Sequence, residues 1–565
     1  MFAKPKPGFL SLVFSLATVL TLVLSACGPT GTPIQSSSNS GKPVKGGVWI
    51  DDLVNEPDSF IPNASVQTFA TMVMQGLYAP IFVGTSKGLI QPGIATEVPT
   101  VQNGGISADS KTWIFHLRPN LVWSDGQPLN ADDVDFTWKL WTNPKFAAAS
   151  TAILKHIQSA DVSADKLTIT FHLKDAFSAF LPAWTDGGLA PLPKHHFESI
   201  PPDQIKKSKD NLFPTVTSGP FMMSESKSGD HYTLVRNPKY YLASQGLPYL
   251  DKVIFRPVAN QETVLKDLQS GSIDSAWFLD AAKLPTYKQL TDYDLVQGTS
   301  ASYEAIHFNE NNPALKDVNV RKAIALAVNQ SELIKIARLG AALPMCTDHS
   351  PAYTPGYQAD AQCPTFDLNA ANKLLDDAGW TKGSDGIRAK GGLRLEFQYS
   401  TTANNAWRAQ DETINQANFA KIGVKVDIRN YPASTFFSTF LGGGKAGTYD
   451  MAEWASSYSY DPNDATQLEC DQIGKNNFNW YCNPQMDALL LKEEQIADPT
   501  QRQQIFNQIH QLILTDFPFA TEFSPNDLSV HKKGTFNYAP GPFAASETVN
   551  IWNWWCNNGK CPSAG

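Results

Sequence analysis

The sequence has no surplus of basic residues and no long cluster of them. Its 565 residues include 45 Lys and Arg against 54 Asp and Glu, which gives a formal charge of −9 at pH 7. A protein that binds nucleic acid through its backbone phosphates needs a basic patch or stripe, so this composition argues against that function class. The acidic balance is typical of a solvated protein surface.

Sequence motifs of the common enzyme classes are also missing. No GxSxG elbow, HExxH helix or Walker A sequence occurs, and GGGKAG at residues 442–447 lacks the Lys-Ser/Thr ending of a phosphate loop. Asp461, Asn463 and Asp464 lack the Gly and the distal carboxylate of an EF-hand. The sequence therefore predicts a protein that is not an enzyme and has no catalytic residue, metal or cofactor. A secreted hydrolase stays open as the alternative class, because a sequence does not give the separation of two carboxylates.

Long hydrophobic runs are absent, apart from one near the N-terminus. Lys4 and Lys6 precede the apolar run Phe9–Leu24, of about 16 residues, which is short for a membrane helix. It ends in Leu24-Ser25-Ala26-Cys27, which resembles the lipobox of bacterial lipoproteins. The resemblance implies a signal peptide at residues 1–27, lipidation of Cys27, and an extracytoplasmic protein anchored to the cell membrane. Residues 28–46, rich in Gly, Ser, Thr and Pro, are predicted to form a disordered tether.

Cysteine is scarce, with seven residues in the chain. An even number follows Cys27, and an even number in an exported chain indicates disulfides, although the sequence leaves their connectivity open. No CxxC pair occurs and no His stands at ligand spacing from the cysteines, which argues against a zinc cluster. Pairing of sequence neighbours is the simplest choice, namely Cys346–Cys363, Cys470–Cys482 and Cys556–Cys561.

Hydrophobic periodicity divides the chain near residue 302 into a strand-rich part and an α/β part. Asn130 is predicted to cap a helix that carries Asp132 and Asp133 in its first turn. The strand–helix–strand order in the second part predicts a partly parallel sheet. Strands are expected at 46–53, 165–173, 393–401 and 424–431, a hairpin around Gly229-Asp230, and helices at 319–340, 367–379, 408–423 and 498–516.

Several of these segments resemble one protein family in order along the chain. DSKTWIFHLRPNLVWSDGQPLNADDVDFTW, beginning at Asp109, resembles the signature of the family 5 extracytoplasmic solute-binding proteins, the oligopeptide-, dipeptide- and nickel-binding components of ABC importers. The resemblance continues in TSGPFMMSESKSGDHYTLVRNPKYY, VNVRKAIALAVNQSELI, LLDDAGW and YDMAEWASSYSYDPND, and covers about residues 45–535.

The resemblance implies an α/β fold of the two-lobed periplasmic-binding-protein type II class, with a hinge and an extra subdomain. Lobe I would comprise residues 47–302, with the subdomain at 64–211, and would be completed by a return at 520–565; lobe II would comprise 303–519. The chain would be a monomer that captures a solute between its lobes and delivers it to membrane-embedded ABC permease subunits. An oligopeptide is the leading solute, and an oligosaccharide, another solute without an amine, or a nickel chelate is the alternative.

The resemblance also implies where the solute binds. The segment that follows the YDM-type strand end lines the cleft in this family, which makes Trp454 a wall residue with Tyr458 and Tyr460 nearby. Peptide-binding relatives carry an aspartate for the α-amino group three residues after this Trp; Ser457 stands there instead, and Asp461 is the nearest acid that could replace it. The alternative is that these aromatic residues are core. Further candidates are Trp407, Asn404, Tyr303, Ser65 and Gln67.

Overall fold

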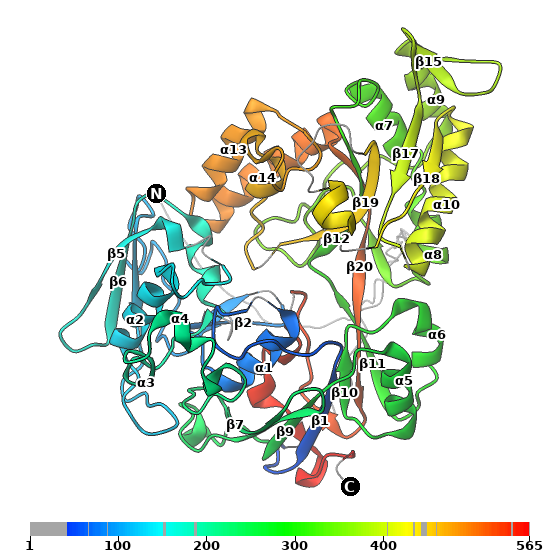
Figure 1. Cartoon of the computed structure of the whole chain (residues 1–565). Helices are drawn as coiled ribbons and strands as arrows, with labels where there is room; N and C mark the ends of the chain where they lie inside the picture. Colours follow the sequence, from blue (N-terminus) through cyan, green and yellow to red (C-terminus); the bar gives the residue numbers. More distant parts are fainter. Residues whose placement is uncertain are drawn as a thin grey trace, which may run out of the picture. The chain divides into compact units, whose positions relative to one another are not determined.

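The computed structural model describes residues 42–65, 67–87, 89–150, 154–185, 189–403, 405–432, 435–441, 449–458, 460–543 and 546–563, apart from the side chains of residues 438 and 439. The predicted signal peptide with Cys27, the tether up to residue 41, and the candidate Asn404 lie outside the described residues. Residues Pro43–Gly565 form one unit, whose helices and strands Figure 1 labels.

One large sheet runs through this unit, and the long strand β20 (Phe519–Lys532) joins its two halves. The second part of β20, from Asn526 on, pairs antiparallel with β10 and β11. Its first part, up to Pro525, pairs antiparallel with β12 and β13. The two halves are called lobe I (β1 and β7 to β11) and lobe II (β12, β13 and β17 to β19). The change of partner falls near residues 525 and 526, a few residues after the predicted boundary.

Lobe I is built around β1, which pairs in parallel with both β9 and β10. The hairpin predicted around Gly229-Asp230 is present as β7 and β8, and β8 pairs with β9. The strands of lobe I are β1 (Val48–Leu53), β7 (Phe221–Lys227), β8 (His231–Arg236), β9 (Lys252–Pro257), β10 (Ser275–Trp277) and β11 (Tyr293–Thr299), and its helices are α1 (Thr68–Leu77), α5 (Gln261–Ser270) and α6 (Leu284–Tyr287).

A smaller antiparallel sheet lies within the predicted subdomain, with α2 (Ala131–Thr142) packed against it (Figure 1). Asn130 caps α2 as predicted: its side chain accepts a hydrogen bond from the Asp132 N–H, and the Asp133 carboxylate accepts one from the Asn130 N–H. The other elements here are β2 (Phe82–Gly84), β3 (Ile90–Pro92), β4 (Thr112–His116), β5 (Ile157–Val162), β6 (Thr168–Leu173), α3 (Lys194–Phe197) and α4 (Pro202–Ile205).

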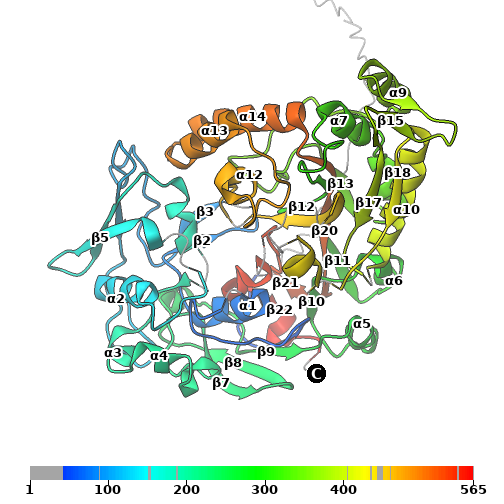
Figure 2. The same ribbon diagram turned by 45° about the horizontal axis from the view of Figure 1, so that its top comes forward.

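Lobe II contains the partly parallel sheet that the sequence predicted. β17 pairs in parallel with β18 and with β19, while β12 pairs antiparallel with β19. Figures 1 and 2 show α10 alongside β17 and β18, and α13 beside α14. The strands are β12 (Ser302–Phe308), β13 (Ala342–Pro344), β17 (Glu396–Ser400), β18 (Lys425–Ile428) and β19 (Met451–Ser457), with small strands at β14 (Thr381–Lys382), β15 (Arg388–Lys390) and β16 (Leu393–Arg394).

The helices of lobe II correct one prediction. The single helix expected at 319–340 is two helices, capped by Asp317 and Asn329, because the Asn329 side chain accepts from the Glu332 N–H and starts a new helix. The apolar pattern runs through the break since both helices face the same core. Among the described residues, no helix has both the length and the hydropathy needed to cross a membrane. The helices are α7 (Val318–Leu326), α8 (Gln330–Ile336), α9 (Leu368–Asp377), α10 (Ala406–Lys421), α12 (Ala465–Leu468), α13 (Pro484–Glu494) and α14 (Pro499–Asp516).

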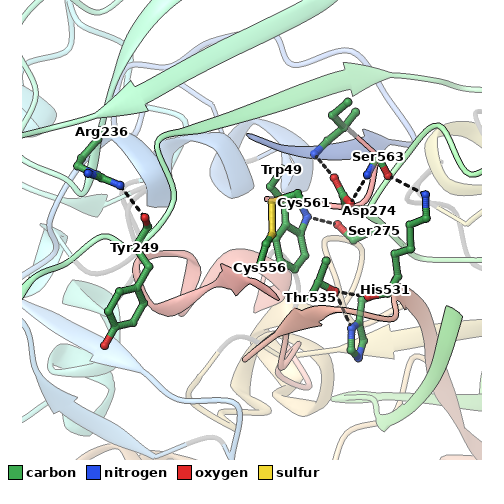
Figure 3. Close-up of a disulfide and its surroundings, with 12 residues drawn as sticks. Trp49, Arg236, Tyr249, Asp274, Ser275, His531, Thr535, Cys556, Cys561 and Ser563 are labelled. Atoms are coloured by element: carbon green, nitrogen blue, oxygen red, sulfur yellow. Dashed lines mark hydrogen bonds between the residues drawn. A yellow bond between two sulfur atoms is a disulfide. The ribbon is translucent and has the colours of Figure 1, made fainter. Parts of the chain in front are cut away.

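The cysteines after Cys27 are joined in three pairs, in the sequence order that was predicted: Cys346–Cys363, Cys470–Cys482 and Cys556–Cys561. The last pair closes the end of the chain, near β21 (Thr535–Phe536) and β22 (Trp555–Cys556), against β1 of lobe I (Figure 3). Next to it the indole N–H of Trp49 donates to Ser275 Oγ at 2.7 Å. The backbone N–H of Ser563 donates to Asp274 at 3.2 Å. The C-terminal segment therefore contacts β1 and β10 of lobe I.

Candidate functional site

A cavity of about 510 Å³ lies between the lobes and is called the inter-lobe cavity. Its first wall comes from the subdomain side of lobe I, and its second from lobe II, where α14 and the segment after β19 face it. Because a ligand in this cavity would touch both lobes, its binding would favour the closed arrangement of the lobes. The lobe I wall comprises residues 89–90, 98–102, Ile106, Ala108, Ser110, Trp113, Ser178 and 181–182, and the lobe II wall Thr354, Pro355, 460–462, 495–499 and 501–502.

The strand β2 contacts the segment after β19 of lobe II at Gly84 and Tyr460. A Cβ atom built on Gly84 would lie 2.2 Å from Cε1 of Tyr460, so a larger residue would have to displace that ring. The ring is held on its other side by Phe543, with ring centroids 4.4 Å apart. Gly84 therefore permits a close contact that a side chain would prevent.

A buried ion-pair group supports the lobe II wall of the inter-lobe cavity. The Arg502 guanidinium donates to the two oxygens of Asp461 at 2.5 and 2.7 Å and to Glu493 Oε2 at 2.7 Å. Burial raises the pKa of Glu493 to about 8, and the charge of Arg502 opposes this rise. Asp461 lines the inter-lobe cavity, and both of its oxygens accept hydrogen bonds from the Arg502 guanidinium. This corrects the expectation that Asp461 is a free acid for an α-amino group.

Trp454 lines a second cavity, of about 260 Å³, which is called the lobe II cavity because its walls belong to lobe II and the start of β20. The Trp454 ring stacks on His307 with centroids 3.5 Å apart and planes 5° apart. Burial lowers the pKa of His307 to about 3, so this ring is neutral at physiological pH. Ser457 is exposed at the rim of the same cavity. Trp454 therefore lines a cavity within a single lobe and does not line the inter-lobe cavity.

Tyr303 and Tyr458 are packed against each other, with ring centroids 6.3 Å apart. Tyr303 stands at the start of β12, at the predicted crossing between lobes, but its ring is buried in the core and also packs on Phe519. Tyr458 is half-buried, and its backbone N–H donates to Tyr353 Oη at 3.0 Å. Tyr303 and Tyr458 line neither the inter-lobe cavity nor the lobe II cavity. For these two tyrosines the core interpretation is the one that fits the structure.

Three further candidates lie away from both cavities. Trp407 is held between the guanidinium groups of Arg338 and Arg408, 4.6 and 4.9 Å from its ring centroid. Ser65 is buried and its hydroxyl accepts from the backbone N–H of Gln67, whose side chain donates to the Glu56 carbonyl. These contacts stabilise lobe II and the entry to α1, so the structure does not place the three residues at a binding surface.

Sequence reasoning missed the lobe I wall and the connection between α13 and α14. Valine, proline, leucine and isoleucine dominate these segments, and such residues carry no motif that distinguishes a ligand wall from core. Among the described residues that line the inter-lobe cavity, the acidic and basic side chains are those of Asp461, Asp498 and Arg502. Asp498 caps α14 by accepting from the Gln501 N–H.

Two lobes that share strand β20, with a cavity lined from both sides, define a protein of the periplasmic solute-binding class. Residues 90–473 match the family "Bacterial extracellular solute-binding proteins, family 5 Middle". The chain belongs to this family, and the resemblance inferred from its motifs is confirmed.

Individual relatives agree with this assignment along almost the whole chain. The chain is 26% identical over 556 residues to the oligopeptide-binding protein AppA of Bacillus subtilis, with 96% of this chain and 98% of the relative covered. The structure of AppA with a nonapeptide matches with a TM-score of 0.70 at 24% identity, covering 91% of this chain and all of that one. NikZ from Campylobacter jejuni in complex with Ni(L-His) matches with a TM-score of 0.72 at 22% identity, covering 90% and 99% of the two chains. The predicted two-lobed fold is thereby confirmed.

Proposed function

We propose that this chain captures an oligopeptide between its lobes and delivers it, chemically unchanged, to the permease of an ABC importer. The observation that carries the proposal is the inter-lobe cavity, with a volume of about 510 Å³ and walls from both lobes. Pockets of about 300–1,000 Å³ are typical of ligand sites, and ligands are commonly bound at domain interfaces. The relationship to an oligopeptide-binding protein of nearly the same length supports the same assignment.

The chemistry of the cavity walls favours a peptide over the alternatives. Aliphatic residues and proline dominate the walls, and they fit the apolar side chains of a peptide better than the polar faces of a sugar. Two aromatic residues are found among the described residues of the walls; Trp113 is buried and Tyr460 packs on Phe543, so neither offers the open ring on which a sugar stacks. No histidine is found among the described residues that line this cavity, which disfavours a nickel chelate held by imidazole.

The peptide would be bound without an ion pair between its α-amino group and Asp461. Arg502 occupies both oxygens of that carboxylate, and Ser457 replaces the aspartate of the peptide-binding relatives. Backbone hydrogen bonds and apolar side-chain contacts would then supply the affinity. A binding mode of this kind accepts peptides with blocked and free N-termini alike.

The lobe II cavity would hold one side chain or one end of the same peptide. Ser457 and Asp461 are four residues apart in the chain, so their Cα atoms lie at most about 14 Å from each other. An extended peptide of a few residues reaches across this distance. Trp454 and Ser457 would therefore make secondary contacts, with the main contacts in the inter-lobe cavity.

The N-terminal sequence supports a location at the outer face of the cell membrane. Lipidation at Cys27 and the tether at 28–46 would keep the solute-binding body, which we propose is monomeric, near its permease; Cys27 and the tether up to residue 41 lie outside the described part of the chain. We propose that no bond of the solute is made or broken, since the family consists of solute-binding proteins.

The proposal is tested by incubating the protein with a mixture of peptides, oligosaccharides and nickel–histidine and identifying what co-purifies by native mass spectrometry. We expect intact peptides in a one-to-one complex. Peptides that bind should also lower the radius of gyration measured by small-angle X-ray scattering, because closure makes the molecule more compact. Recovery of shortened peptides would indicate a hydrolase, and recovery of a glycan or a nickel complex alone would overturn the peptide assignment.

A further inference from the structure

We propose that Asp348, His349 and His510 form a buried zinc site that fastens the lobe II wall of the inter-lobe cavity. The three residues come from two parts of the chain: Asp348 and His349 follow Cys346, and His510 lies on α14. Each of the three side chains is fully buried, with 0% exposure. Among the described residues they form one of two clusters whose ligand atoms all lie within 4.8 Å of one another.

The three ligand atoms lie close enough together to share one zinc ion. His349 Nδ1 lies 2.8 Å from His510 Nε2, and Asp348 Oδ1 lies 3.5 Å from each of these nitrogens. The two Asp348 distances match the spacing of about 3.4 Å between ligands of a tetrahedral site, and the two nitrogens would move apart by about 0.6 Å to reach it. The centre of this triangle is about 1.9 Å from each corner, so an ion at zinc–ligand distances of about 2.0–2.2 Å would sit just above its plane. Two imidazoles and one carboxylate leave a fourth tetrahedral position, which a water fills in sites with three protein ligands.

The surrounding contacts are those that orient metal ligands. The second ring nitrogen of His349, Nε2, donates to the Pro462 carbonyl oxygen at 2.7 Å and lies 3.3 Å from Asp464. The second oxygen of Asp348 lies 3.4 Å from the Tyr458 hydroxyl, which donates to it. Ligating histidines usually give their other N–H to a carbonyl or carboxylate, as His349 does here, whereas Nδ1 of His510 is buried without a hydrogen-bond partner among the described residues. Nδ1 of His349 and Oδ1 of Asp348 are thus the atoms turned toward the shared position.

A second buried carboxylate lies beside the cluster. Asp348 and Asp464 are both fully buried, and Asp464 Oδ1 lies 3.3 Å from His349 Nε2. Buried carboxylates are normally paired with a cation or bound to a metal, so a divalent ion at the shared position would have both of them as neighbours.

The site would join three segments next to the cavity. The loop that carries His349 is held to the lobe crossing by Tyr353, whose hydroxyl donates to the Ala301 carbonyl at 3.0 Å. The contact to Pro462 reaches the segment that contains Asp461. An ion at this position would connect that loop, α14 and the cavity wall, and full burial implies that it is taken up when the chain folds.

The test uses the full mature chain without a polyhistidine tag, purified from cells grown with zinc, and measures its metal content by mass spectrometry. We expect one zinc per chain. His510→Gln should lower this content at least about tenfold, because one of three ligands is lost. His156→Gln removes a buried histidine outside the cluster and should leave the content unchanged. Wild-type protein that stays free of zinc, or His510→Gln protein that keeps it, would overturn the proposal.

A measurement on the wild type covers the case in which His510→Gln protein does not fold. The protein is unfolded in denaturant with a chelator, with its disulfides intact, and refolded with Co²⁺ in place of zinc. A tetrahedral Co²⁺ site gives intense visible absorption bands, which we expect at one equivalent and which added Zn²⁺ should abolish. Refolded protein without these bands would show that the cluster holds a proton and no metal.

Discussion

The inter-lobe cavity and the lobe II cavity differ in which parts of the molecule line them and in the chemistry of their walls. The inter-lobe cavity is lined mostly by apolar residues, many of them proline, has walls from both lobes, and rests on the ion-pair group of Asp461, Arg502 and Glu493. The lobe II cavity has Ser, Thr, Gln and Asn side chains around Trp454 and the neutral His307, and no acidic or basic side chain other than His307 among its described lining residues.

The two cavities therefore contribute differently to binding and to closure of the lobes, although one segment of the chain lines both of them. Strand β19 ends at Ser457, on the lobe II cavity, and the chain reaches the inter-lobe cavity at Tyr460. A ligand bound only in the lobe II cavity has the same contacts whether the lobes are open or closed, so it cannot shift that equilibrium. A ligand in the inter-lobe cavity gains contacts on closure. Binding energy that drives closure must therefore come from the inter-lobe cavity.

The largest effect is expected from breaking the ion-pair group with Arg502→Met. This change leaves the Asp461 and Glu493 carboxylates buried without their cation, which costs about 3–5 kcal/mol of unfolding free energy. Unfolding in guanidinium chloride, followed by tryptophan fluorescence, measures the loss. Arg394→Met is the matched control: Arg394 is 43% exposed in its pair with Asp385, so the loss should be about 0–1 kcal/mol. Equal losses would mean that the group does not support the wall.

The comparison of the cavities is tested directly by filling each with the same side chain. Ala497 lines the inter-lobe cavity and packs against the lobe I core, while Ser457 lies at the rim of the lobe II cavity. Ala497→Trp should weaken peptide binding at least about 100-fold, equivalent to about 2.7 kcal/mol. Ser457→Trp should weaken it by about tenfold or less. Calorimetric titration with one peptide measures both, and a larger loss for Ser457→Trp would reverse the ranking of the two cavities.

His307 in the wall of the lobe II cavity should make the free energy of unfolding depend on pH. Because burial lowers the pKa of His307 to about 3, the unfolded chain binds a proton there between about pH 6.5 and pH 3 and the folded chain does not. The stability that neutral, buried His307 contributes is therefore fully present above the pKa of this histidine in the unfolded chain, about 6.5, and is lost as the pH falls. Between about pH 6.5 and pH 4.5 the free energy of unfolding should fall by about 2 kcal/mol because of His307. His307→Gln should remove this part of the pH dependence in denaturant unfolding, and an unchanged slope would mean that His307 titrates normally.

Much of the fold could be predicted from the sequence, because local patterns determine most of its elements. The Asn130 cap, the Gly229-Asp230 hairpin and the parallel pairing of β17 with β18 each follow from short-range signals. The break between α7 and α8 was missed because apolar spacing continues across Asn329. Periodicity reports which face is buried and does not report whether the backbone is continuous.

The site was less predictable, because its parts meet only in the folded chain. Trp454 was found through a family motif, whereas Ala497 and the lobe I wall carry no motif. Asp461 was recognised as a nearby acid, but its partner Arg502 stands 41 residues away, so the sequence could not show that its charge is already balanced. His349 and His510 are 161 residues apart, which is why no metal site was predicted from local spacing.

The smallest effect is expected from Asp461→Asn. The quantity to measure is the ratio of the dissociation constants of a free-amine peptide and of its N-acetylated form. If Asp461 paired with the peptide α-amino group, the variant would weaken a free-amine peptide by at least about 100-fold more than its N-acetylated form, since breaking a buried charge pair costs about 3–5 kcal/mol. In the structure the Asp461 carboxylate accepts two hydrogen bonds from Arg502 instead. The variant should then be less stable, because the wall loses part of its ion pair, yet both peptides should weaken to the same extent. We expect the ratio of their dissociation constants to change by less than about twofold. A selective loss of the free-amine peptide would show that the ammonium displaces Arg502 on binding, which would return the primary contact to the segment after Trp454.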